Sequence, residues 1–185
     1  MNPVLVAGLG NVFHGDDGCG VAVAQRMAAA PRRAGVDVVD FGLRGLDLAF
    51  ALTGGYRVAV LIDTVQRGSA PGTLYLIEPE IEPEIEPEPA HTDAHGLSPH
   101  QIDPVGVLRM TRLLGGPCAR VLRVGCEPAS FGDADEGRMG LNEAPAAAVG
   151  GAAAMAIAAI DEWMAGHPLS LDDARTGASA LPTTM

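Results

Sequence analysis

Two carboxylates and an imidazole are the side chains in this sequence that could hold a metal or carry out hydrolysis: Asp17, Asp63 and His100. Asp17 follows an apolar run that opens at Val4, after a loop with closely spaced glycines, and Asp63 ends the apolar run Tyr56–Asp63. His100 stands in a Ser-Pro-His-Gln segment at the start of a helical pattern. Two carboxylates and one imidazole with room for water suit a first-row metal such as Zn²⁺, Mn²⁺ or Ni²⁺.

The elements that must position these residues alternate between strands and helices. Such alternation predicts an α/β fold, a three-layer α/β/α sandwich on a mostly parallel sheet of about five strands. Because ligands of such sheets bind beyond the carboxyl ends of the strands, the three residues can face one crevice. An aspartate after a strand or a histidine before a helix is often structural when alone, so the metal interpretation depends on their convergence. Strands are expected from Val4 and over Val36–Asp40, Tyr56–Asp63, Thr73–Ile77 and Arg120–Cys126, and helices over Val21–Ala30, Leu46–Leu52, Gln101–Leu114 and Asn142–Met164.

The first loop also invites a nucleotide-binding interpretation, because Gly8-Leu9-Gly10 follows an apolar strand. The third glycine of a dinucleotide fingerprint is replaced by Phe13, and Asp16 and Asp17 stand where a pyrophosphate would bind the helix start. Like charges would repel there, which disfavours a nucleotide. A simple helix cap is expected to account for one of the two aspartates but not for the other.

Length and charge set further bounds. The 185 residues are 48% hydrophobic, which predicts one globular domain over 1–166. Their formal net charge of −11 argues against nucleic acid or an anionic membrane as partner.

Ile-Glu-Pro-Glu is repeated in tandem from Ile77, and its prolines and glutamates predict an extended, solvated loop over 77–94. A cation or a partner protein is the alternative ligand of this loop. Residues 167–185 are expected to form a disordered tail.

The three cysteines, Cys19, Cys118 and Cys126, are spaced neither as a disulfide framework nor as a metal motif. A reducing, cytoplasmic location is therefore expected, and no basic leader precedes the first apolar run. The run Ala146–Ile160 is shorter and less apolar than the ~20 residues that span a bilayer. It is expected to be a core helix, without membrane insertion.

No side chain is a convincing nucleophile. Cys19 lacks an evident histidine partner, and Ser98 lies beside Pro99 without an elbow motif. His91 and His95 could reach a metal from the acidic loop, although solvated loop histidines are the simpler interpretation.

Together, five short segments resemble the hydrogenase maturation endopeptidases over about Val4–Met164, apart from the Ile-Glu-Pro-Glu insert. The combination of the opening motif with the second aspartate and the histidine is more specific than any one part. The segments are Gly8-Leu9-Gly10-Asn11, Asp16-Asp17-Gly18-Cys19-Gly20, Asp63 followed by Pro71-Gly72-Thr73, Ser98-Pro99-His100-Gln101, and Val124-Gly125-Cys126-Glu127-Pro128.

This resemblance implies a nickel-dependent endopeptidase that removes the C-terminal extension of a [NiFe]-hydrogenase large-subunit precursor after metal insertion. It implies that Asp17, Asp63 and His100 bind the metal and act in catalysis, with Asp16 and Asp40 in supporting roles. The metal or a carboxylate beside it would activate water. Nickel is expected to arrive with the precursor, and the isolated enzyme, expected to be a monomer, to bind none.

Two other functions remain open at this point. A nickel-dependent checkpoint or metallochaperone for hydrogenase assembly would need the same three ligands without hydrolysis. A nucleotide-binding α/β module is the second, already disfavoured by Phe13 and the paired aspartates.

Overall fold

The computed structural model describes residues 3–78, 104–116, 120–132 and 137–167. Within them the chain forms a five-stranded sheet in the order β2-β1-β3-β5-β4. β1, β2, β3 and β5 are parallel, and β4 runs antiparallel to β5 at one edge. The strands are β1 (Val4–Leu9), β2 (Val36–Gly42), β3 (Val58–Thr64), β4 (Leu74–Ile77) and β5 (Arg120–Cys126).

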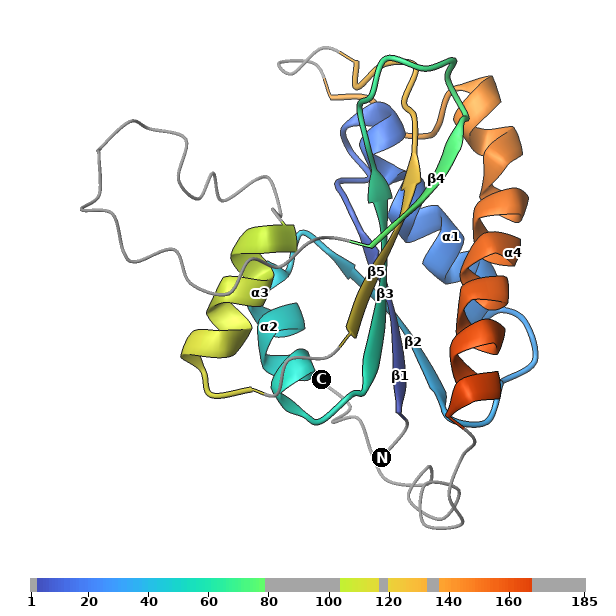
Figure 1. Ribbon diagram of the computed structural model, residues 1–185. Coiled ribbons are helices and arrows are strands. Elements are labelled where there is room, and N and C mark those ends of the chain that lie inside the picture. Colours follow the sequence, from blue (N-terminus) through green and yellow to red (C-terminus); the bar gives the residue numbers. More distant parts are fainter. Residues whose placement is uncertain (1–2, 79–103, 117–119, 133–136, 168–185) are drawn as a thin grey trace.

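Helices cover both faces of this sheet, as Figure 1 shows. α1 (Cys19–Ala28) and α4 (Glu143–Gly166) pack on one face, and α2 (Gly45–Thr53) and α3 (Pro104–Leu113) on the other. Each face has its own apolar cluster, built mainly from Val, Leu, Ile and Ala side chains. The predicted three-layer α/β/α sandwich is confirmed.

The alternation of side chains along β3 decides which face each functional residue meets. Val60 and Ile62 belong to the cluster under α1 and α4, whereas Leu61 belongs to the cluster under α2 and α3. Because successive strand residues point to opposite faces, Asp63 lies on the α2/α3 face and Thr64 on the α1/α4 face. Both are at the carboxyl end of the sheet, uppermost in Figure 1.

Glycine at position 20 lets α1 pack directly on the end of the sheet. A Cβ there would lie 2.1 Å from the carbonyl oxygen of Ile62 and 2.4 Å from that of Leu9. No side chain fits such a space, so Gly20 allows backbone-to-backbone contact. The contact holds the 3₁₀ helix η1 (Gly15–Gly18), which precedes α1, against β3.

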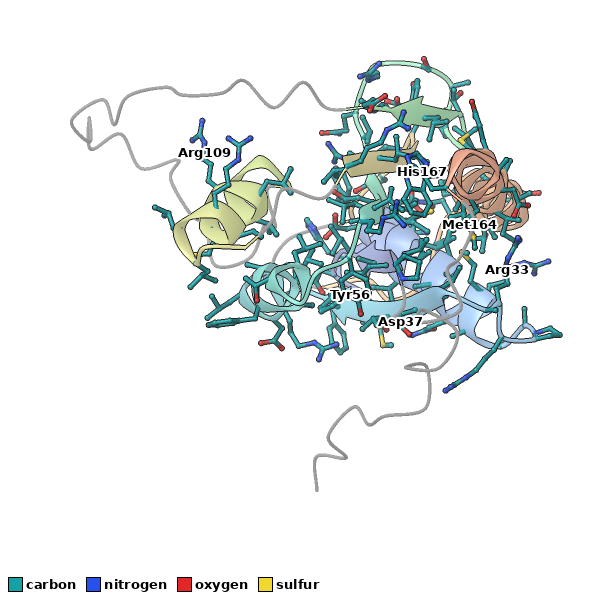
Figure 2. The ribbon with its side chains drawn as sticks, turned by 60° about the horizontal axis from the view of Figure 1, so that its bottom comes forward. Arg33, Asp37, Tyr56, Arg109, Met164 and His167 are labelled. Carbon is teal, nitrogen blue, oxygen red and sulfur yellow. The ribbon has the colours of Figure 1, made fainter. Side chains whose placement is uncertain are left out.

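The opposite end of the sheet is closed by polar pairs. Tyr56 donates a 2.9 Å hydrogen bond to Oδ2 of Asp37, and Figure 2 labels the two side chains close to each other. Burial of the Tyr56 phenol, together with this bond to a carboxylate, raises its pKa. Arg57 lies over the ring of Trp163, with its Cζ atom 5.2 Å from the ring centroid. These contacts lie far along the strands from Asp63.

Most predicted elements are confirmed to within a few residues, and β5 begins and ends where the sequence predicts. α1 begins at Cys19 rather than Val21. The part of α3 predicted before residue 104, the repeat from residue 79 to 94 and the tail from residue 168 lie outside the described residues.

α4 differs from the expectation for the run Ala146–Ile160. The helix has 24 residues and contains a window with mean hydropathy 1.5, so by length and composition alone it could cross a membrane. The expectation concerned the run Ala146–Ile160 alone, and the helix extends beyond this run at both ends. Its buried residues, including Ala156, Ile160 and Trp163, pack on the sheet, which confirms the expected place in the core.

Candidate active site

Asp17 is positioned by the loop that joins β1 to α1. It lies in η1, half-buried, and its Oδ2 accepts a 2.8 Å hydrogen bond from the backbone N–H of Asn11. Gly10 makes this loop possible: its φ is +120°, and a Cβ there would lie 1.8 Å from the carbonyl oxygen of Asp17. The glycine spacing noted in the sequence thus brings the Asp17 carboxylate back over the end of β1.

Asp63 is the more deeply buried carboxylate, with 8% of its surface exposed. Its Oδ1 accepts a 2.8 Å bond from the backbone N–H of Thr64. Burial raises the pKa of Asp63 against the opposing effect of the Arg123 cation, and the nearby charge of Asp17 raises it further. The Asp17 carboxylate is therefore close enough to act electrostatically on Asp63.

Thr64 connects these two aspartates. Its hydroxyl donates a 3.1 Å bond to Oδ1 of Asp17, while its backbone N–H serves Asp63. The two predicted acids, one from the first loop and one from the end of β3, thus both contact Thr64. Sequence reasoning missed Thr64, although a hydroxyl residue directly after a strand-ending aspartate is a visible signal.

Arg123 is the second residue that sequence reasoning missed. Its Nη2 lies 2.8 Å from Oδ2 of Asp63 and donates a 3.0 Å bond to the carbonyl oxygen of Thr64. Its Nε atom is buried without a hydrogen-bond partner in the described residues. The only signal in the sequence is a charged residue between Leu122 and Val124, in the interior of a strand whose other interior residues are Val, Leu and Gly.

Asp16 has a different environment from Asp17. Fully buried, it accepts backbone bonds from Ala129, Ser130 and Asn142, and a further bond from the Asn142 side-chain amide. Burial opposes ionisation, but these bonds outweigh it and lower the pKa of Asp16. Asp16 therefore joins the first loop to the loop after β5 and to the start of α4.

The simple capping interpretation of the paired aspartates is wrong. The N-cap residue of α1 is Gly18, and it makes no side-chain cap hydrogen bond. Asp17 instead accepts a hydrogen bond from the N–H group of Asn11, in the loop before η1. Asp16 accepts one from the N–H group of Asn142, at the start of α4.

Asp40 is a predicted site residue for which the described structure gives a partner other than Asp17 and Asp63. Asp40 lies near the end of β2 and accepts a 3.1 Å bond from the Gln25 side chain of α1. His100 lies outside the described residues.

A metal can be tested against the donors present. Among the residues described, no group of three His, Cys, Asp or Glu side chains could hold a metal ion. Asp17 and Asp63 supply two carboxylates, and the guanidinium of Arg123 already lies against one of them. The Asp63 carboxylate thus already binds a cation. The carboxylate oxygens of Asp17 and Asp63 also suit a divalent cation, provided that other groups supply its remaining ligands.

Cys19 and Cys126 form a pair that the sequence did not predict. Cys19 and Cys126 are free and buried, and they contact each other across α1 and the end of β5. The bond to Cys126, together with burial, raises the pKa of the Cys19 thiol. The bond from Cys19 lowers the pKa of the Cys126 thiol. Cys19, which stays protonated, is therefore a poor nucleophile.

Glu127, directly after β5, fixes the loop that follows Asp63. Its carboxylate accepts bonds from the backbone N–H groups of Arg67 and Gly68, and a 2.6 Å bond from the Tyr75 hydroxyl. The Tyr75 bond and these backbone bonds lower the pKa of Glu127. Glu127 in the Cys126-Glu127-Pro128 segment thus has a structural role, which is to hold this loop.

Exposed apolar side chains lie in the loop before η1 and in the loop before α4. Phe13 is 62% exposed and Met139 is 72% exposed. Their loops are joined by a 2.8 Å bond from the Arg138 N–H to the Phe13 carbonyl and a 2.7 Å bond from the Gly15 N–H to the Arg138 carbonyl. Two segments distant in sequence thus present large apolar groups to solvent from loops joined at the start of η1.

Known proteins resemble this chain in sequence. "Hydrogenase expression/formation protein HupD" of Rhodobacter capsulatus is 34% identical over 133 residues, which cover 70% of this chain and 59% of that protein. "Hydrogenase expression/formation protein HoxM" of Cupriavidus necator is 33% identical over 70% of this chain and 61% of that protein. The chain thus spans about three fifths of the length of these curated relatives.

Solved structures resemble it in fold. The hydrogenase maturating endopeptidase HybD of E. coli superposes with a TM-score of 0.67 at 23% identity, over 86% of this chain and 93% of that one. A hydrogenase 2 maturation peptidase from Thaumarchaeota archaeon SCGC_AB-539-E09 superposes with a TM-score of 0.62 at 26% identity, over 85% of this chain and 97% of that one. A family profile described as HycI, hydrogenase maturation protease, matches residues 21–159. The chain belongs to the hydrogenase maturation protease family.

Proposed function

We propose that this protein is an endopeptidase that removes the C-terminal extension of a [NiFe]-hydrogenase large-subunit precursor after nickel has been inserted. The observation that carries the proposal is the link through Thr64, whose hydroxyl and N–H groups bring Asp17 and Asp63 to one point at the end of β3. Membership of the family supplies the reaction class.

In this proposal Asp17 and Asp63 bind the nickel that the precursor carries, and His100 completes the set. The bound nickel supplies Lewis acidity to the scissile carbonyl or to water. Asn11 and Thr64 hold the half-buried Asp17 carboxylate, and in this proposal the metal or a carboxylate beside it would activate the attacking water. Cleavage would thus require a nickel-loaded substrate.

The surface beside the aspartates suits a protein substrate. Phe13 and Met139 offer apolar contact area next to Asp17, and such exposed groups commonly mark sites of protein contact. We place the precursor against this end of the sheet, with its C-terminal extension over Asp17 and Asp63. The reaction would take place in the cytoplasm, with the enzyme acting as a monomer and no resident cofactor.

Mass spectrometry of the precursor tests this function. Nickel-loaded and nickel-free precursors of a candidate hydrogenase are incubated with the protein, and the large-subunit mass is followed. Loss of one defined C-terminal peptide from the loaded precursor alone is the expected result. Nickel-dependent complex formation without a mass change would instead indicate an assembly checkpoint, and cleavage regardless of nickel would contradict the metal dependence.

A further inference from the structure

Arg123 presents a cation to the carboxylate that the proposed function assigns to nickel. We propose that Arg123 is a placeholder for the metal: it neutralises Asp63 in the metal-free protein and must leave that carboxylate when nickel arrives. This inference rests on the proposed role of Asp63. It makes Arg123 a positioning residue that limits binding of free metal ions.

The position of Arg123 follows from the sheet. β3 and β5 are parallel neighbours, with Asp63 opposite Gly125. Arg123 is two residues before Gly125, so its side chain lies on the same α2/α3 face as Asp63. Nη2 reaches along the strand to Oδ2 of Asp63, at 2.8 Å, and to the Thr64 carbonyl, at 3.0 Å. The guanidinium therefore occupies one of the Asp63 oxygens.

The pair has the features of a contact that can be exchanged. Only Nη2 of Arg123 serves Asp63, and its buried Nε finds no partner in the described part of the chain. By contrast, Arg120 on the same strand binds Glu78 through two nitrogens, at 2.7 and 3.0 Å. Two parallel bonds are the stronger arrangement, so the Arg123 pair is incompletely satisfied.

Electrostatics explain why a cation is present at all. The Asp63 side chain is 11% exposed and lies near the second carboxylate, Asp17. A buried charge is costly unless it is paired, and Arg123 provides that pairing. A divalent ion would neutralise both carboxylates and would repel the guanidinium. Arg123 keeps 26% of its side chain exposed, which gives it a path toward solvent.

The consequence is selectivity against free metal. When a free Ni²⁺ ion displaces Arg123, only its bonds to the ligands of this protein offset the cost of breaking the ion pair. Nickel in a precursor arrives with the additional contacts of a docked protein, which offset the displacement. Arg123 thus favours nickel presented by the substrate over nickel in solution.

Titration of the purified full-length protein with Ni²⁺, in competition with a chromophoric chelator, tests the inference. Arg123→Met keeps the apolar stem and removes the charge, and Arg120→Met is the matched control on the same strand. We expect Arg123→Met to bind Ni²⁺ about tenfold more tightly than the wild type, and Arg120→Met to bind as the wild type does. The double variant Asp63→Asn/Arg123→Met should lose the gain.

Thermal unfolding provides a second readout if Arg123→Met is less stable. Because this variant leaves Asp63 unpaired, Ni²⁺ should raise its melting temperature more than that of the wild type, and Arg123→Lys should respond as the wild type does. Unchanged or weaker Ni²⁺ affinity in Arg123→Met overturns the inference, even if the precursor is cleaved. Tighter Ni²⁺ binding without cleavage of any loaded precursor would support the inference and contradict the proposed function.

Discussion

The Nη2 atom of Arg123 lies 2.8 Å from the Oδ2 atom of Asp63, at the carboxyl end of neighbouring strands. This ion pair shows that the end of β3 is built to hold positive charge. The hydroxyl of Thr64, 3.1 Å from Asp17, brings a second carboxylate to the same place. The proposed binding of nickel delivered by the precursor rests on this arrangement.

Replacing Asp16 should affect stability. Asp16→Asn places an amide among N–H donors, which should lower the free energy of unfolding by about 1–3 kcal/mol. Because the folded-state pKa of Asp16 lies below its ordinary value of 3.8, its contribution is complete above that value and is lost as the pH falls through the folded pKa. Urea unfolding should therefore show a large difference between variant and wild type at neutral pH and a smaller one below pH 3.8. A difference that does not depend on pH would contradict this account of Asp16.

Thr64→Val should reduce activity more than stability. Valine keeps the branched shape in the strand but removes the hydroxyl that holds Asp17. Loss of one hydrogen bond to a charged group should lower kcat for precursor cleavage about tenfold. Thr64→Ser, which keeps the hydroxyl, is the control and should retain most activity. Equal losses in the two variants would show that the hydroxyl bond is not what matters.

Phe13→Ser should weaken recognition of the precursor. Phe13 is 62% exposed, so its removal costs little folding energy but takes away apolar area beside the site. KM should rise about tenfold with little change in kcat. Leu113→Ser is the matched control, because Leu113 is 82% exposed at the end of α3. A similar rise in KM for both variants would argue against docking at Phe13.

Gly20→Ala should strongly destabilise the fold. The new methyl group would lie 2.1 Å from the Ile62 carbonyl oxygen, and backbone on both sides of that contact cannot move freely. We expect a loss of about 3 kcal/mol or more in the free energy of unfolding, measured by urea titration. Gly166→Ala has open space around its new methyl group and should be neutral or slightly stabilising. Wild-type stability of Gly20→Ala would mean that α1 does not pack as closely as described.

Much of the fold could be predicted from the sequence, because its strands are continuous apolar runs between glycine-rich turns. The buried run ending at Asp63 is a central parallel strand, and Arg120–Cys126 is a strand with both ends as predicted. Local patterns indicate a strand and its bounds. They do not give strand order, which places β5 between β3 and β4.

The candidate site was predictable only in part for the same reason. Asp17 and Asp63 could be placed at the carboxyl edge from their elements alone. The contact of Arg123 with Asp63 requires β5 to pair with β3 in one particular register. No local sequence pattern specifies that register. Similarly, the partners of Asp16 come from a loop more than 110 residues away. The role of His100 remains a prediction.

The most direct measurement of the central claim is the cleavage rate of nickel-loaded precursor by the wild type, Asp17→Asn, Asp63→Asn and the double variant, followed by mass spectrometry. If the two carboxylates act together on one metal, each single variant should lose about a hundredfold in rate, and the double variant should be little worse than either. Cleavage at the wild-type rate by either single variant would contradict the account.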